Sequence, residues 1–203
     1  MRMNLPNQIT IGRFFLAIVF LVGLSFFDWR SRDSQLWLID TAFYIFIIAA
    51  VSDILDGYLA RKQNQVTSFG RILDPFVDKS LVCGGFVLLL GSGFIDANGR
   101  NVNGLAAWMV VIIISRELLV SGLRGFYEAK GTPYGSNMWG KVKMVVQSTT
   151  VPLILKTAGS WREYPWVMTI RDIMIWVTLA VTALSAVSYL MASREALAER
   201  GRA

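Results

Sequence analysis

The chain has 203 residues, of which 54% are hydrophobic and only 17% are charged, and its formal net charge is +6 at pH 7. Soluble domains carry about 25% charged residues, so this composition favours a membrane protein whose basic residues face anionic lipid rather than nucleic acid. The lack of histidine excludes a Ser-His-Asp triad and histidine-bound zinc, and the single cysteine, Cys83, excludes a disulfide within one chain.

Six apolar segments follow one another along the chain. The first begins after Pro6, contains Arg13 and is followed by no small-residue cleavage site, so we expect a retained span rather than a signal peptide. Only the last offers about 20 uncharged residues, and the others reach the length of a membrane span by including charged residues at one end. The segments are 9–27, 36–57, 73–94, 105–126, 142–155 and 173–191. We predict an all-α polytopic membrane protein with six transmembrane helices that form one domain over residues 1–203.

Lysine and arginine are distributed unevenly over the connections between these segments. If the N-terminus lies inside, most of them fall on the inner side, which predicts that both termini are cytoplasmic. This topology also gathers the charged ends of the spans on the cytoplasmic face, where they indicate a water-filled cavity. Ordinary snorkelling at the interface is an alternative that accounts for Arg13 but poorly for four aspartates.

Four aspartates flank the connection between the second and third segments. Asp53 and Asp56 are three residues apart and Asp74 and Asp78 four apart, so each pair lies on one helical face, and the short connection predicts antiparallel neighbouring helices. Converging carboxylates need a counter-charge, and oxygen ligands favour Mg²⁺, Mn²⁺ or Ca²⁺, two of which suit displacement at phosphorus. The alternative is a solvated loop in which the aspartates pair with nearby basic residues, namely Arg61, Lys62, Arg71 and Lys79.

Residues 53–78 read Asp-x2-Asp-Gly-x2-Ala-Arg-x8-Gly-x3-Asp-x3-Asp. At every position this pattern resembles the motif of the CDP-alcohol phosphotransferases. The resemblance implies a six-helix membrane enzyme, usually a homodimer, which transfers a substituted phosphate group from a CDP-linked lipid to an alcohol and releases CMP.

The resemblance also implies a role for each residue of the motif. Asp78 would accept the proton of the acceptor hydroxyl. Two divalent ions, Mg²⁺ or Mn²⁺, would be bound by Asp53, Asp56, Asp74 and Asp78. The CDP moiety would be held by Asp56, Gly57, Ala60, Arg61 and Gly70.

A second polar group spans the fourth and fifth segments. Glu117, Ser121 and Arg124 share a helical face with Arg116 beside it, and two lysines begin the fifth segment. Buried arginines need a carboxylate or a phosphate as partner, and Glu117 can satisfy one of them. We therefore expect an anionic acceptor, although flanking charge that follows the positive-inside rule is the alternative. The candidate phosphate-binding residues are Arg116, Arg124, Lys141 and Lys143.

The wider sequence, over roughly residues 4–155, is similar to the bacterial members of this family that make phosphatidylglycerol phosphate, with Met144 where they lead us to expect threonine. This resemblance implies transfer of the phosphatidyl group of CDP-diacylglycerol to sn-glycerol 3-phosphate at the cytoplasmic face of a bacterial inner membrane. A sister enzyme that uses inositol phosphate or phosphatidylglycerol is one alternative. A divalent-metal transporter is another, but the aspartates lie at one membrane level and only Asp40 is an acid deep in the other half.

Overall fold

The computed structural model describes the backbone of residues 5–62, 68–131 and 138–200, and side chains over 7–53, 70, 73–131, 138–191 and 193. Within these ranges the chain forms six α-helices and two short 3₁₀ turns and contains no β-strand, which confirms the all-α prediction. The helices are α1 (Leu5–Ser25), α2 (Arg32–Lys62), α3 (Ser68–Leu89), α4 (Ala107–Ala129), α5 (Met138–Ala158) and α6 (Pro165–Arg200).

The helix ends differ from those of the apolar segments: α1 and α3 end earlier, at Ser25 and Leu89, whereas two other helices are longer. Both α2 and α6 continue for several residues past the apolar run at each end, because Arg, Lys, Glu and Ala are good helix formers even where nothing buries them. Proline lies inside α3 at Pro75 and inside α5 at Pro152, which is tolerated in membrane helices because neighbouring groups satisfy the freed backbone. The polar functional residues therefore sit on continuous helices rather than on loops.

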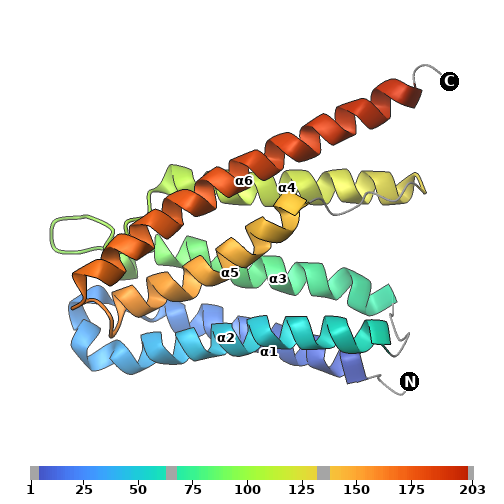
Figure 1. Ribbon diagram of the computed structural model, residues 1–203. Helices are drawn as coiled ribbons and strands as arrows, with labels where there is room; N and C mark the ends of the chain where they lie inside the picture. The colour runs from blue at the N-terminus through green and yellow to red at the C-terminus, as the bar shows by residue number, and fades with distance from the viewer. Residues whose placement is uncertain (1–4, 63–67, 132–137, 201–203) are drawn as a thin grey trace.

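The helices form a bundle in which α1 packs against both α2 and α3, α5 packs against α2 and α6, and α4 packs against α6 (Figure 1). The core contains large buried side chains from several helices, and the rings of Phe20 and Phe46 meet edge to face at 5.6 Å. The helices α2 and α3 run antiparallel, as predicted, but they contact each other only slightly, because α1 lies against both.

The two ends of the bundle differ in what they hold. The start of α1, the end of α2, the start of α3 and the end of α6 lie at one end, on the right in Figure 1, which we call the motif end. The connections 26–31, 90–106 and 159–164 lie at the opposite end, which we call the far end.

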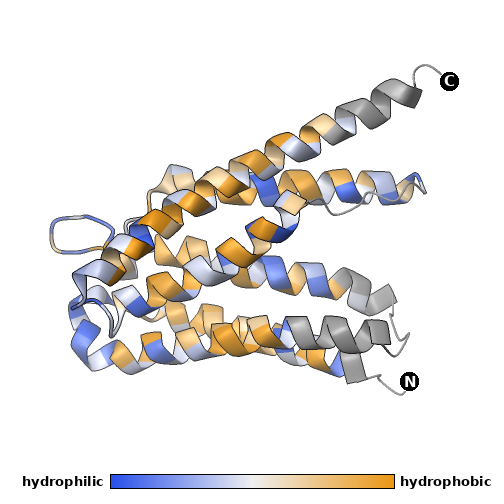
Figure 2. Cartoon of the chain, in the orientation of Figure 1, coloured by the Kyte–Doolittle hydropathy of each residue, from blue (hydrophilic) through white to orange (hydrophobic). Residues whose placement is uncertain are grey.

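The surface of the bundle is suited to lipid. Within the described part of the chain, three helical stretches are long and apolar enough to cross a membrane: Asn7–Ser25, Trp29–Asp53 and Pro165–Met191. Apolar residues dominate the middle of the helices and polar residues gather at their ends (Figure 2). So much exposed apolar surface indicates contact with lipid, and it includes Phe15, Ile48, Val87, Leu118, Val145 and Trp176. The chain is therefore a membrane protein.

Candidate active site

The aspartates at the motif end are contacted by two side chains of α1. The guanidinium of Arg13 lies 2.6 Å from the carboxylate of Asp53, and Arg13 is only 2% exposed. The hydroxyl of Thr10 donates a hydrogen bond of 2.7 Å to Asp74. The snorkelling interpretation of Arg13 is therefore wrong, because a buried cation at this position supplies counter-charge to the aspartates.

Three of the four predicted aspartates can be placed: Asp53 lies in the last third of α2, Asp74 in the first third of α3 and Asp78 midway along α3. Asp53, Asp74 and Asp78 are all partly exposed, and Gly70 is buried nearby on α3. The charges that act on Asp78 come from two carboxylates and two cations. They belong to Asp53, Lys143, Arg13 and Glu117.

The remaining motif residues fall on the last turns of α2, whose side chains lie outside the described residues. They are Asp56, Gly57, Ala60 and Arg61. Among the side chains that the structure describes, no group of three or more carboxylates, thiols or imidazoles is close enough to hold a metal ion. Because Asp56 is outside that set, the predicted four-aspartate site stays a prediction.

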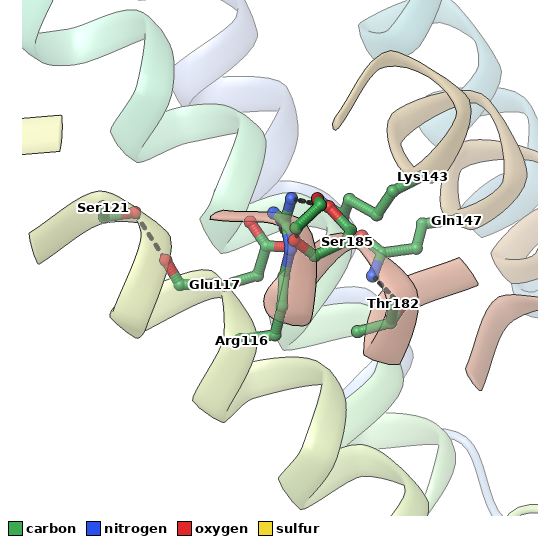
Figure 3. Close-up of polar contacts among 8 residues, drawn as sticks. Arg116, Glu117, Ser121, Lys143, Gln147, Thr182 and Ser185 are labelled. Atoms are coloured by element: carbon green, nitrogen blue, oxygen red, sulfur yellow. Dashed lines mark hydrogen bonds and ion pairs between the residues drawn. The ribbon is translucent and has the colours of Figure 1, made fainter. Parts of the chain in front are cut away.

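A second cluster is buried where α4, α5 and α6 meet (Figure 3). Glu117 pairs with Arg116 at 3.1 Å and also with Lys143, and all three residues are less than a tenth exposed. The second guanidinium nitrogen of Arg116 donates a hydrogen bond to the hydroxyl of Ser185, and the guanidinium lies 5.5 Å from the ring centre of Tyr189. Among the described residues, one carboxylate lies within ion-pair distance of these two buried cations, so the cluster itself holds one more positive than negative charge.

The other two predicted phosphate ligands lie outside this cluster. Arg124 and Lys141 are both exposed. The hydroxyl of Ser121, on the same face as Glu117, donates to the backbone carbonyl of Glu117 one turn earlier. The buried cations Arg116 and Lys143 are therefore the ones whose position the fold determines.

Lys143 connects the two clusters. It pairs with Glu117, and it is also among the charges that act on Asp78. Asp78 on α3 and the buried Lys143 on α5 therefore lie close enough for their charges to interact.

Polar side chains of α6 support this site and were missed by the sequence reasoning. Gln147 donates to Thr182 at 3.3 Å (Figure 3), and the hydroxyls of Thr150 and Thr178 share a hydrogen bond of 2.8 Å. All four are almost fully buried, so α5 and α6 meet along a polar seam that continues to Ser185. The signal was present as polar residues at helical spacing within the apolar sixth segment.

The acid in the other half of the bundle is not continuous with the aspartates. Asp40 pairs with Lys156 at 2.6 Å, and the Lys156 ammonium also lies 4.6 Å from the ring centre of Phe43. This partly buried pair joins α2 to α5. Asp40 is therefore engaged in a structural contact rather than in a polar pathway that begins at the motif end.

Comparison with known proteins assigns the class of this molecule. A model of the CDP-alcohol phosphatidyltransferase family matches residues 3–184, and the chain belongs to that family of membrane enzymes. Three relatives bear the name CDP-diacylglycerol–glycerol-3-phosphate 3-phosphatidyltransferase. The one from Bacillus subtilis is 35% identical over 201 residues, covering 96% of this chain and 97% of that protein. The one from Rickettsia felis is 32% identical, and the match covers 95% of this chain and 96% of that protein. The one from Salmonella typhimurium is 31% identical, and the match covers 96% of this chain and 97% of that protein.

Proposed function

We propose that this enzyme transfers the phosphatidyl group of CDP-diacylglycerol to sn-glycerol 3-phosphate, forming phosphatidylglycerol phosphate and releasing CMP. The names of the relatives support both substrates. The observation that carries the choice of acceptor is the buried surplus of positive charge at Arg116 and Lys143, beside Asp78. A cationic acceptor such as choline has no anionic group that would pair with it.

The acceptor's phosphate would bind where the surplus charge lies. Arg116 offers a planar donor that suits phosphate oxygens, and Lys143 adds a second charge-assisted hydrogen bond. Arg124 and Lys141 are exposed, and they would attract the anionic acceptor and help to hold it at the entrance. In this arrangement the acceptor's free hydroxyl points from the basic cluster toward the aspartates.

The donor's CDP moiety would be held at the motif end by Asp56, Gly57, Ala60, Arg61 and Gly70. Two divalent ions, Mg²⁺ or Mn²⁺, would be bound by four aspartates. Three of these, Asp53, Asp74 and Asp78, offer partly exposed oxygen donors, which suit hard cations; the fourth is Asp56. When bound, the ions neutralise the diphosphate and the negative charge on the departing CMP.

The residues of the chain then have distinct tasks in the reaction. Asp78 accepts the proton from the acceptor hydroxyl, whose oxygen forms a new bond to the phosphorus of the phosphatidyl group. The bond from that phosphorus to the CMP oxygen breaks, and CMP leaves with the electron pair. Arg13, paired with Asp53 at 2.6 Å, holds that carboxylate in place, and the buried Arg116 and Lys143 fix the acceptor so that the reaction becomes effectively unimolecular.

The placement in the membrane is part of the proposal. The motif end faces the cytoplasm, with both termini on that side, in the inner membrane of a bacterium. The chain acts as a single domain over residues 1–203 and assembles as a homodimer. The exposed apolar side chains of the bundle contact lipid or the second copy.

The test is release of CMP by the purified protein in detergent with CDP-diacylglycerol and Mg²⁺ or Mn²⁺. Glycerol 3-phosphate, inositol phosphate, serine and phosphatidylglycerol are supplied one at a time. We expect release with glycerol 3-phosphate alone, and its loss when a chelator is added. Release with only a different alcohol would refute the proposed acceptor, and no release with any alcohol from folded protein would refute the proposed reaction.

A further inference from the structure

At the far end of the bundle, two guanidinium groups lie over the ring of one tryptophan. Trp29 is part of the 3₁₀ turn that precedes α2. The guanidinium carbon of Arg162 lies 4.4 Å from the centre of the Trp29 ring, and that of Arg32 lies 5.5 Å from it. Two cations on one aromatic ring repel each other unless an anion lies between or beside them.

The two arginines differ in how far their polar groups are satisfied. Arg32 donates to the carbonyl oxygens of Ala158 and Gly159 at 3.1 Å and 2.7 Å and pairs with Asp33 at 3.0 Å. These bonds hold the start of α2 against the end of α5. All of its donor groups that face the protein are engaged, so Arg32 has a structural task.

Arg162, in contrast, lacks a counter-ion. Its Nη1 atom is buried without a hydrogen-bond partner in the described part of the chain, and no described carboxylate lies within ion-pair distance of it. Burial lowers the pKa of Arg162, and so do the charges of Arg32 and Arg171, against a smaller opposite effect of Asp96. Arg171 is itself paired with Asp172 at 2.7 Å. Among the described residues, the positive charge of Arg162 therefore has no neutralising counter-ion.

A groove of about 460 Å³ lies against Trp29. It is lined by Trp29, Arg30, Ser31, Arg32, Asp33 and Ser34. Arg30 and Ser31 are exposed there and offer donors, whereas the Ser34 hydroxyl donates to the carbonyl of Ser31. The exposed Asp33 is the one acid of the lining, and it is paired with Arg32. The groove is large enough for a phosphate group with part of its glycerol.

The groove lies at the depth of lipid headgroups. Arg32 and Asp53 are on the same unbroken helix, and a rise of about 1.5 Å per residue separates them by about 30 Å, the thickness of the hydrocarbon core. Trp161, Tyr164 and Trp166 are exposed in the connection that carries Arg162 and at the start of α6. Exposed tryptophan and tyrosine are typical of the interface between lipid and water.

We propose that Arg162, stacked on Trp29 beside this groove, binds the phosphate group of a phospholipid headgroup in the leaflet opposite the active site. The phosphate would place negative charge beside the partly exposed guanidinium of Arg162 and relieve the repulsion between the two guanidinium groups. Lipid is favoured over free phosphate because the groove opens at the level where headgroup phosphates are concentrated. The site is independent of the proposed reaction, because none of its residues contacts the aspartates or the buried cations of the motif end.

The experiment compares Arg162→Gln with Arg100→Gln, which removes an exposed arginine from another connection at the same end. Protein stripped of lipid in an uncharged detergent is titrated with phosphatidylglycerol, with diacylglycerol of the same acyl chains, or with inorganic phosphate. The unfolding midpoint at each concentration gives an apparent affinity. Turnover of CDP-diacylglycerol verifies that each variant is folded, since neither arginine belongs to the catalytic machinery.

We expect phosphatidylglycerol, but not diacylglycerol, to stabilise the parent protein and Arg100→Gln alike. Arg162→Gln should bind phosphatidylglycerol about tenfold more weakly, the effect of losing a charge-assisted hydrogen bond. Equal affinity in both variants, or an equal loss in both, would overturn the proposal. A loss for inorganic phosphate without a loss for the lipid would mean that the site takes the free ion, and the lipid assignment would be wrong.

Discussion

The replacement Glu117→Gln tests the buried charge cluster most sharply. The Glu117 carboxylate pairs with Arg116 at 3.1 Å and with Lys143, and all three side chains are buried. Glutamine keeps the size of the side chain and one acceptor oxygen, but it removes the only carboxylate that the structure pairs with these two cations. The variant therefore leaves two like charges buried together.

The cost follows from the burial. Removing one partner of a buried ion pair destabilises a protein by about 3–5 kcal/mol, because the remaining charge has left water without compensation. A bound phosphate can replace the lost negative charge. A ligand present at about 100 times its dissociation constant adds about 2.7 kcal/mol of stability, so much of the loss should be recovered when glycerol 3-phosphate is added.

The assay is the unfolding midpoint in detergent with and without glycerol 3-phosphate. Glu128→Gln is the matched control, because Glu128 is exposed on the same helix and such surface changes alter stability by less than about 0.5 kcal/mol. We expect Glu117→Gln to unfold at a lower temperature than the control and to gain more from the ligand than the parent does. A Glu117→Gln protein that is as stable as the control, with no larger gain from the ligand, would refute the reasoning.

Three further predictions concern the reaction and one loop. Asp78→Asn should abolish CMP release but leave CDP-lipid binding largely intact, and near-normal turnover would rule out Asp78 as the base. Arg116→Ala should raise the acceptor KM by about tenfold or more and Arg124→Ala by less, because a charge-assisted hydrogen bond is stronger in a buried place. Equal KM values for both variants and the parent would exclude phosphate binding by either arginine. Backbone N–H groups of Arg100 and Asn98 donate to Asp96 and hold the pKa of its carboxyl below its usual range. The ionised carboxylate therefore stabilises its loop above about pH 4, and this contribution is lost as the pH falls through the lowered pKa. A carbon-13 titration of labelled aspartates should give Asp96 a midpoint below about 3.9, and a midpoint above that value would contradict the contact.

Local patterns in the sequence were sufficient for the helices and for the placement of three aspartates. Helical spacing and the short connection predicted that the aspartates of the second and third segments lie near one another, and in the structure the charge of Asp53 acts on Asp78. These inferences needed only the period of a helix and the length of a membrane span. Asp56 could be assigned only by its place in the motif.

Contacts between distant segments could not be predicted in the same way. Thr10 meets Asp74, and Arg116 meets Ser185, only because of how α1 packs on α3 and α4 on α6. A single sequence carries little information on which helices pack together. The close packing of α1 against α3 also explains why α2 and α3, joined by a short connection, touch so little.

The face that each helix buries was equally hard to infer. Arg124 shares a helical face with Glu117 in the sequence, yet Arg124 is exposed and Arg116 is buried with Glu117. The buried face of α4 is set by its packing on α6, and a helix in lipid has no strong contrast between an apolar inner face and a polar outer one. The polar residues of the sixth segment, Thr182 and Ser185 among them, were the best available sign of that packing.

The most direct test of the account is a competition in one vessel. Purified protein receives CDP-diacylglycerol, Mg²⁺ and equal concentrations of glycerol 3-phosphate, inositol phosphate, serine and phosphatidylglycerol, and the lipid products are identified by mass spectrometry. The product ratio reports the ratio of kcat/KM values for the acceptors. The account predicts phosphatidylglycerol phosphate as the dominant product, with one CMP for each molecule formed. A different lipid as the main product would contradict the assignment of Arg116 and Lys143 to the phosphate of glycerol 3-phosphate.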